Sequence, residues 1–256
     1  AWVTLIVQCV MVLSACVAIK ILPTYQSLQL FSGWERPRLA QLRIYATLGI
    51  PAGLASMVEV TSYALMGLLV ARMGVLATAA HQIAASVAAV LFMLPLSLSI
   101  ASSARVSYWM GAGEAALAAA LARSALKLTI AVAVVASLGL ALLAAPIARL
   151  YSGDEQVAQV GTGLLMFVAM YHIADAWQTI GCFLLRCWRI TVMPMMVYLA
   201  TLWACGLGGG YLLAYGGLPF IGAWNHPQAF WLMGLLALSA AAVAFQWRIW
   251  RLTRLK

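Results

Sequence analysis

Long apolar runs separated by short polar connections are the feature that most constrains the fold of this 256-residue chain. Reading the runs between charged residues gives seven candidate spans, at about residues 1–19, 44–71, 77–103, 124–145, 157–185, 190–214 and 228–249. A spanning helix needs roughly 20 apolar residues, whereas strands of a membrane barrel need roughly ten with alternating polarity. Backbone polar groups cannot stay unpaired in lipid. The sequence therefore predicts an all-α polytopic membrane protein with seven transmembrane helices.

Basic residues predict how these spans are oriented. With 65% hydrophobic and 8% charged residues, the chain lies far outside the soluble range, where about 25% are charged. Its net charge of +9 is therefore interpreted as membrane topology, with the lipid bilayer as partner and no nucleic acid. Thirteen of the fifteen Lys and Arg lie on alternate connections: Lys20, Arg36, Arg38, Arg43, Arg105, Arg123, Lys127, Arg186, Arg189, Arg248, Arg251, Arg254 and Lys256. The positive-inside rule then predicts a multi-pass protein of a bacterial-type inner (plasma) membrane, with its C-terminus in the cytoplasm.

Two cytoplasmic connections and one glycine run carry further expectations. Residues 20–43 and 105–123 mix basic and apolar residues, which predicts interfacial amphipathic segments. Gly208, Gly209 and Gly210 lie inside the sixth span and permit close helix packing or bending, of which packing is the commoner use. The five cysteines form no CxxC pair and have no histidines at metal-ligand spacing, so no zinc, redox couple or other cofactor is predicted.

Two of the six acidic residues lie inside predicted spans. Glu59 is near the middle of the second span, and Asp175 lies within the fifth, toward its cytoplasmic half. An ionised residue at mid-bilayer costs about 2.5–3.5 kcal/mol on insertion scales, so such a residue usually has a function. Residues three and four apart share one face of a helix. Polar residues at this spacing accompany both acids: Ser56, Ser62 and Tyr63 around Glu59, and Tyr171, Gln178 and Thr179 around Asp175.

Each acid thus sits in a polar stripe that we expect to face a cavity or another helix. Carboxylate, phenol and amide oxygens are hard ligands suited to a small cation such as Na⁺, and a carboxylate can also take up a proton. Glu59 and Asp175 are therefore candidate cation ligands.

Histidines are the weaker site candidates. His81 and Gln82 open the third span and could line a cavity, as could His172, which follows Tyr171. His226 lies in the last outer connection, where a histidine is more often an interfacial hydrogen-bonding residue than a ligand.

Enzyme motifs are missing from the sequence. It contains no GxSxG, GxGD or HExxH motif, and no Ser, His and Asp that would lie at one depth, so the sequence predicts no enzyme. Seven spans could indicate a retinal protein, but Lys20 and Lys127 lie at span ends and leave no mid-membrane amine for a Schiff base. A receptor is a further possibility that side-chain chemistry alone does not rule out, although two buried acids on polar stripes suit a transporter better.

The stretch of residues 48–111 resembles the start of the second half of multidrug and toxic compound extrusion (MATE) transporters. The matching features are Pro51, the Glu59–Val60 pair, the His81–Gln82 pair, Pro95 and Arg105–Val106. MYHIADAWQTI at residues 170–180, Arg186, Pro194 and FWLMG at residues 230–234 follow in the family's order. Cys187, Trp188 and Arg189 depart from the family's usual glycine and acid in that loop.

The resemblance implies a division of the chain and a set of site residues. Residues 44–256 would form the six-helix C-terminal lobe, and residues 1–43 the last helix of the N-terminal lobe plus a cytoplasmic linker. The family's cation site maps onto Glu59, Asp175 and Tyr171, three residues that the helical spacing had already selected. Because five earlier helices are missing and the chain begins with Ala1, we expect it to start inside a longer polypeptide.

The expected function is cation-coupled antiport, driven by sodium or protons, that exports organic cations or drugs, here from a partial chain. A second possibility is a non-transporting fragment or half-transporter that needs the missing N-terminal lobe or a second copy. A lipid-linked oligosaccharide flippase ranks third, because it would need cationic residues in its cavity and no Lys or Arg lies mid-span.

Overall fold

The computed structural model describes residues 2–26, 38–216 and 222–254, and within these ranges it is helical with no strand. The elements are α1 (Trp2–Ile21), α2 (Pro23–Gln26), α3 (Leu39–Ala71), α4 (Val75–Gly111), α5 (Ala115–Tyr151), α6 (Glu155–Cys187), α7 (Val192–Tyr198), η1 (Leu199–Gly208), α8 (Gly209–Tyr211), η2 (Leu212–Gly216) and α9 (Gln228–Arg254). The described residues contain seven helices long and apolar enough to cross a membrane, with α7 to η2 counted as one. The predicted all-α, seven-span class is confirmed.

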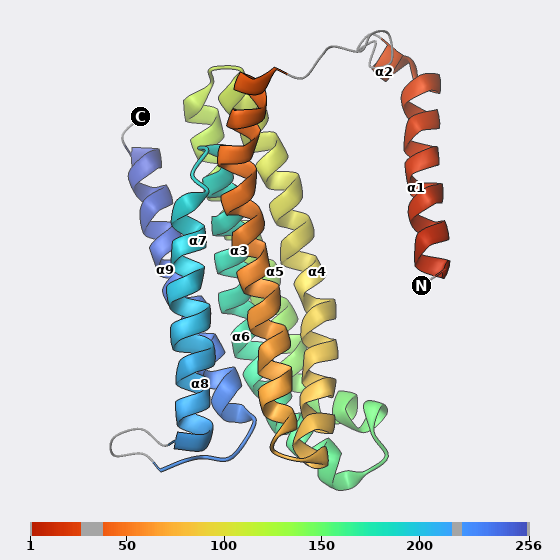
Figure 1. The fold of residues 1–256 in the computed structure, drawn as a ribbon, viewed down its shortest axis with the longest axis vertical. Coiled ribbons are helices and arrows are strands. Elements are labelled where there is room, and N and C mark those ends of the chain that lie inside the picture. Colours follow the sequence, from red (N-terminus) through yellow and green to blue (C-terminus); the bar gives the residue numbers. More distant parts are fainter. Residues whose placement is uncertain (1, 27–37, 217–221, 255–256) are drawn as a thin grey trace. The chain divides into compact units, whose positions relative to one another are not determined.

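The chain divides into two compact units, Ala1–Tyr45 and Ala46–Lys256. The first contains α1 and α2, and α1 is apolar on all sides, as expected of a helix that contacts lipid. The second holds the six remaining spans, whose long helices run up and down side by side (Figure 1). The predicted cation-site residues all belong to this second unit.

Helix α6 is the centre of the second unit. It packs against α4, α5 and α9, and buried residues follow it from Ala158 to Leu185. Many of these are small, including Gly161, Ala169 and Gly181, which lets neighbouring backbones approach closely. In lipid, helices associate through such close packing rather than through removal of apolar surface from water. Asp175 and Gln178 are carried on this central helix and are themselves buried.

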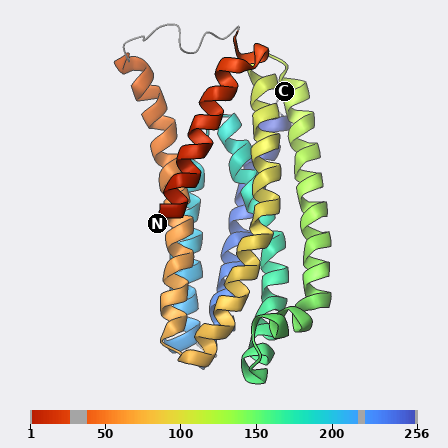
Figure 2. The ribbon, with the colours of Figure 1, turned by 90° about the vertical axis from the view of Figure 1, so that its right-hand side faces the viewer.

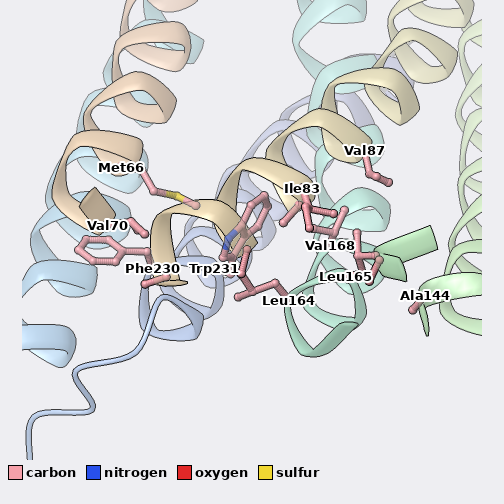
Figure 3. Packing of buried hydrophobic residues seen from close by; sticks show 14 of the residues in the cluster. Met66, Val70, Ile83, Val87, Ala144, Leu164, Leu165, Val168, Phe230 and Trp231 are labelled. Carbon is pink, nitrogen blue, oxygen red and sulfur yellow. The ribbon is translucent and has the colours of Figure 1, made fainter. Parts of the chain in front are cut away.

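A cluster of buried apolar side chains contains residues from α6 and from four other helices. Met66 and Val70 from α3 and Phe230 and Trp231 from α9 belong to it, and Trp231 is fully buried. Figure 3 shows these side chains together with Ile83 and Val87 of α4, Ala144 of α5 and Leu164, Leu165 and Val168 of α6. The cluster thus includes residues of all five helices, and Glu59 of α3 and Asp175 of α6 both lie within hydrogen-bond distance of Gln178 Nε2.

The prediction of an interfacial segment at residues 105–123 is wrong. Helix α4 continues to Gly111 and α5 begins at Ala115, so only a short turn separates them. Figure 2 shows the two helices side by side up to this turn. Each has 37 residues, a length of about 55 Å that exceeds the roughly 30 Å hydrocarbon core. Alanines favour the helix, and Ala118 and Ala122 bury one face against Val106, so the segment extends the bundle.

The other predicted interfacial segment, at residues 20–43, falls largely outside the described residues, which leave out 27–37. At its described ends, residues 20–21 finish α1, residues 23–26 form α2, and Leu39–Arg43 begin α3.

The sixth span is wound as two π-helical stretches, η1 and η2, around the short α8. In this span, Gly209 and Gly210 allow close helix packing, as predicted. A Cβ built on Gly210 would lie 2.6 Å from Phe230 Cδ1, and one on Gly209 would lie 2.4 Å from Met233 Cε. Both neighbours belong to α9, so the sixth span and α9 touch where these glycines lack side chains.

These two glycines give a matched test of the packing. Gly210→Ala must displace the ring of fully buried Phe230, and we expect a loss of about 1–3 kcal/mol in unfolding free energy. Gly209→Ala meets only the end of a flexible methionine, so its melting temperature should stay near that of the unchanged chain. Thermal unfolding of the purified protein in detergent measures both. Equal melting temperatures for the two variants would contradict this packing.

Candidate cation-binding site

A cavity of about 260 Å³ lies between α3, α4, α6, η1 and α9. Its polar wall is made by Glu59, Ser62, Tyr63, Tyr171 and Asp175. The rest of the wall is almost entirely apolar: Val60, Met66, Ala88, Ala89, Phe92, Leu202, Gly206, Leu207, Phe230, Gly234 and Leu238. All three residues of the predicted cation site therefore face one cavity.

Gln178 connects the two carboxylates. Its Nε2 donates to Glu59 Oε1 at 3.1 Å and to Asp175 Oδ1 at 3.0 Å. Glu59 comes from α3 and Asp175 from α6, so residues far apart in the sequence share one hydrogen-bonding nitrogen. Both carboxylates are thus within reach of one small ion, which could replace the amide hydrogens between them.

Tyrosines and one tryptophan form the aromatic side of the site. The ring of Tyr171 stands edge-on to Trp231 at 5.3 Å, and that of Tyr63 does so at 6.2 Å. Tyr63 also donates its hydroxyl to the Ala85 carbonyl at 3.4 Å. Gly234 leaves room for Tyr171, because a Cβ there would lie 3.2 Å from Tyr171 Cε2. Trp231 therefore supports both tyrosines, a role that the sequence could not show among ten tryptophans.

The other residues predicted to line a cavity are distributed differently. Ser62 and Tyr63 do line this cavity, whereas Gln178 and Thr179 lie behind its wall, both buried and bonded to each other at 3.0 Å. Ser56 is exposed and donates to the Ala52 carbonyl within its own helix, so it points away from the site.

His81 and Gln82 are also outside the cavity wall. His81 is buried with its ring 5.8 Å from that of Trp231, and Gln82 is exposed on the other side of α4. His172 is buried in α6, on a different face from its neighbour Tyr171, which lines the cavity.

His226 behaves as the hydrogen-bonding residue that the sequence suggested. Its Nδ1 accepts from the backbone N–H of Gln228 at 3.3 Å, next to the start of α9. Partial burial lowers the pKa of His226, so its neutral form, which has the free lone pair needed for this bond, is favoured.

A chain of polar side chains leads from the site toward the C-terminal end of α6. Tyr198 donates its hydroxyl to Gln178 Oε1, and Arg186 Nη2 lies 3.6 Å from Cys182 Sγ. Tyr198 and Cys182 are both buried and belong to one cluster of packed side chains. The sequence did not single out Tyr198, because no acidic residue lies near it in its own span.

A bundle of six membrane-length helices, five of which line a cavity with two carboxylates, defines a multi-pass membrane protein with an ionisable site among its helices. The MatE family model matches residues 51–212. The chain belongs to this family, the multidrug and toxic compound extrusion proteins, as the sequence motifs had suggested.

Relatives agree with this assignment. The chain is 37% identical over 227 residues to a probable multidrug resistance protein, NorM, from Aromatoleum aromaticum, which covers 87% of this chain and 48% of the relative. It is 35% identical over 218 residues to the multidrug resistance protein MdtK from Edwardsiella ictaluri, covering 84% and 47%. The chain thus spans about half the length of the relatives it matches.

Solved structures share the fold. The Vibrio cholerae MATE transporter VcmN in its bent form superposes with a TM-score of 0.78 at 18% identity, over 93% of this chain and 53% of that one. The eukaryotic MATE transporter AtDTX14 gives the same TM-score and identity, again over 93% and 53%. The fold of this chain is therefore that of about half of a MATE transporter.

Proposed function

We propose that this chain is the C-terminal lobe of a cation-coupled antiporter that exports organic cations or drugs from the cytoplasm. Residues 1–43 would be the last helix of the N-terminal lobe and its linker. The observation that carries the proposal is the pairing of Glu59 and Asp175 on one amide nitrogen in an internal cavity. The names of the relatives, multidrug resistance proteins, support the substrate class.

Coupling follows from the electrostatics of this pair. Two carboxylates inside a low-dielectric bundle repel each other and are costly to keep ionised. A sodium ion or a proton bound between them relieves both effects, and Tyr171, on the same cavity wall, can add an oxygen ligand. A bound cation shifts the balance between two transporter conformations only if its affinity differs between them. A site shared by α3 and α6 meets this need, since a relative movement of the two helices that changes the distance between the carboxylates changes the cation affinity.

The apolar wall suits an amphipathic organic cation. Tyr63, Phe92, Tyr171 and Phe230 offer aromatic surface, and Met66 is an adaptable apolar contact. The carboxylates would attract the positive charge of such a molecule. An organic cation and the coupling ion would then compete for the same charges, which is the basis of exchange.

The cavity is open on the side where a second lobe would sit. Val60 lines the cavity and is 68% exposed, and Ala89 on α4 is an exposed lining residue as well. An N-terminal lobe, or a second copy of this chain, would complete the cleft. We place the assembly in a bacterial inner membrane, with the C-terminus of this chain in the cytoplasm, as the basic residues predict.

A lipid-linked oligosaccharide flippase fits less well. The pyrophosphate of such a lipid calls for cationic side chains, and among the described residues no Lys or Arg lines the cavity. The two carboxylates would repel it.

Replacing either carboxylate tests the proposed site. In the purified chain, we expect Glu59→Gln or Asp175→Asn to weaken sodium binding, or proton uptake if protons couple, by about tenfold or more, because a charged ligand is lost. Isotope binding measures sodium, and an indicator dye measures protons. Glu155→Gln is the matched control, since Glu155 pairs with Arg149 at an exposed connection. Unchanged cation binding in both site variants would refute the assignment.

Transport should need more than this chain. We expect purified chain in liposomes to give no gradient-driven flux of a fluorescent organic cation above empty vesicles, because the cleft has only one wall. Flux from this chain alone would show that two copies form a working cleft, and the half-transporter would replace the partial-chain interpretation.

A further inference from the structure

Gln178 holds a central position that the coupling scheme above does not use. Its side chain is fully buried on α6. The amide nitrogen lies within hydrogen-bond distance of Glu59, of Asp175 and, at 3.0 Å, of Thr179 Oγ1. The amide oxygen points the other way and accepts from Tyr198. The carboxamide is therefore oriented with its donor edge toward the site and its acceptor edge toward Tyr198.

This orientation suits a site without a cation. Ionised carboxylates can only accept hydrogen bonds, so each needs a donor, and the two N–H groups of Gln178 supply them. A sodium ion between the carboxylates would face these same partly positive hydrogens and be repelled. A bound proton creates the same conflict, because a protonated carboxyl carries a donor of its own that needs an acceptor.

We propose that cation binding turns the carboxamide of Gln178 over, so that Oε1 faces the carboxylates and Nε2 faces Tyr198. This inference rests on the cation site proposed above. With sodium bound, Oε1 becomes a further ligand, and with a proton bound, Oε1 accepts from the carboxyl O–H. Rotation about the terminal bond of a glutamine side chain is soft, so the movement requires no change in the backbone.

Tyr198 can hydrogen-bond to the carboxamide of Gln178 in both of its orientations. A phenol hydroxyl can donate or accept, so it donates to Oε1 without a cation and accepts from Nε2 with one. Tyr198 is 2% exposed and cannot turn to solvent, but the buried Cys182 thiol lies in the same cluster of packed side chains. When Nε2 faces Tyr198, the hydroxyl hydrogen turns to Cys182 Sγ, next to Arg186. The state of the cation site thereby reaches the cytoplasmic end of α6 through reversed hydrogen bonds, without proton transfer.

Vibrational spectroscopy can observe the amide directly. The purified chain is prepared with isotope-labelled glutamine, and infrared difference spectra are recorded on adding sodium at fixed pH and, separately, on lowering the pH without sodium. We expect a cation-induced shift of a labelled amide carbonyl band, absent in Gln178→Leu. Gln246→Leu is the matched control, because Gln246 is also in a span but donates to the Trp177 carbonyl, away from the carboxylates. That variant should keep the shift.

Measurements of cation affinity and a second variant, Tyr198→Phe, complete the test. Gln178→Leu should bind the cation about tenfold more weakly, since one ligand is lost. Tyr198→Phe keeps the amide but removes its donor, so the cation-free carbonyl band itself should move. A wild-type chain that binds the cation with no labelled glutamine band changing would overturn the amide switch and leave the cation site standing. A wild-type chain that binds neither sodium nor protons would overturn both proposals.

Discussion

The pairing of Glu59 and Asp175 through Gln178 is the interaction on which the rest of the site depends. Inside a helical bundle, neither carboxylate can rely on water, so each must find its partner within the protein. The amide of Gln178 provides hydrogen bonds to both, and its own oxygen is satisfied by Tyr198. The position of α3 relative to α6 therefore sets the distance between the two carboxylates.

The helical bundle holds Glu59 and Asp175 at the wall of a cavity. The central helix α6 is fixed on three sides by α4, α5 and α9, and small residues keep these contacts close. On the remaining side, α3 and α6 both line the cavity, and Ser62 and Tyr63 of α3 donate to the backbone carbonyls of Leu202 in η1 and Ala85 in α4. The site thus sits between a rigid core and a more loosely attached helix.

Much of this arrangement could be predicted from the sequence, for a physical reason. In lipid, long apolar runs allow few folds, and a charged residue within such a run requires a partner. The seven spans could therefore be predicted from spacing, as could the need of Glu59 and Asp175 for partners. Tyr198 and Trp231 were missed because their roles come from contacts between helices, which spacing along one helix does not reveal. The segment at residues 105–123 was misread because basic and apolar residues alternate similarly in an interfacial helix and in an extended hairpin. Ala118 and Ala122 are buried in one cluster with Val106, which identifies the segment as an extended hairpin.

A double-mutant cycle on the two carboxylates tests the central claim, that Glu59 and Asp175 form one cation site. Sodium affinity, or proton uptake, is measured for the purified chain, for Glu59→Gln, for Asp175→Asn and for the double variant. Residues that share one bound ion have strongly non-additive effects. The structure predicts that the double variant binds the cation no more weakly than the weaker of the two single variants. Losses that simply add, expressed as binding free energies, would show that the two carboxylates act at separate sites.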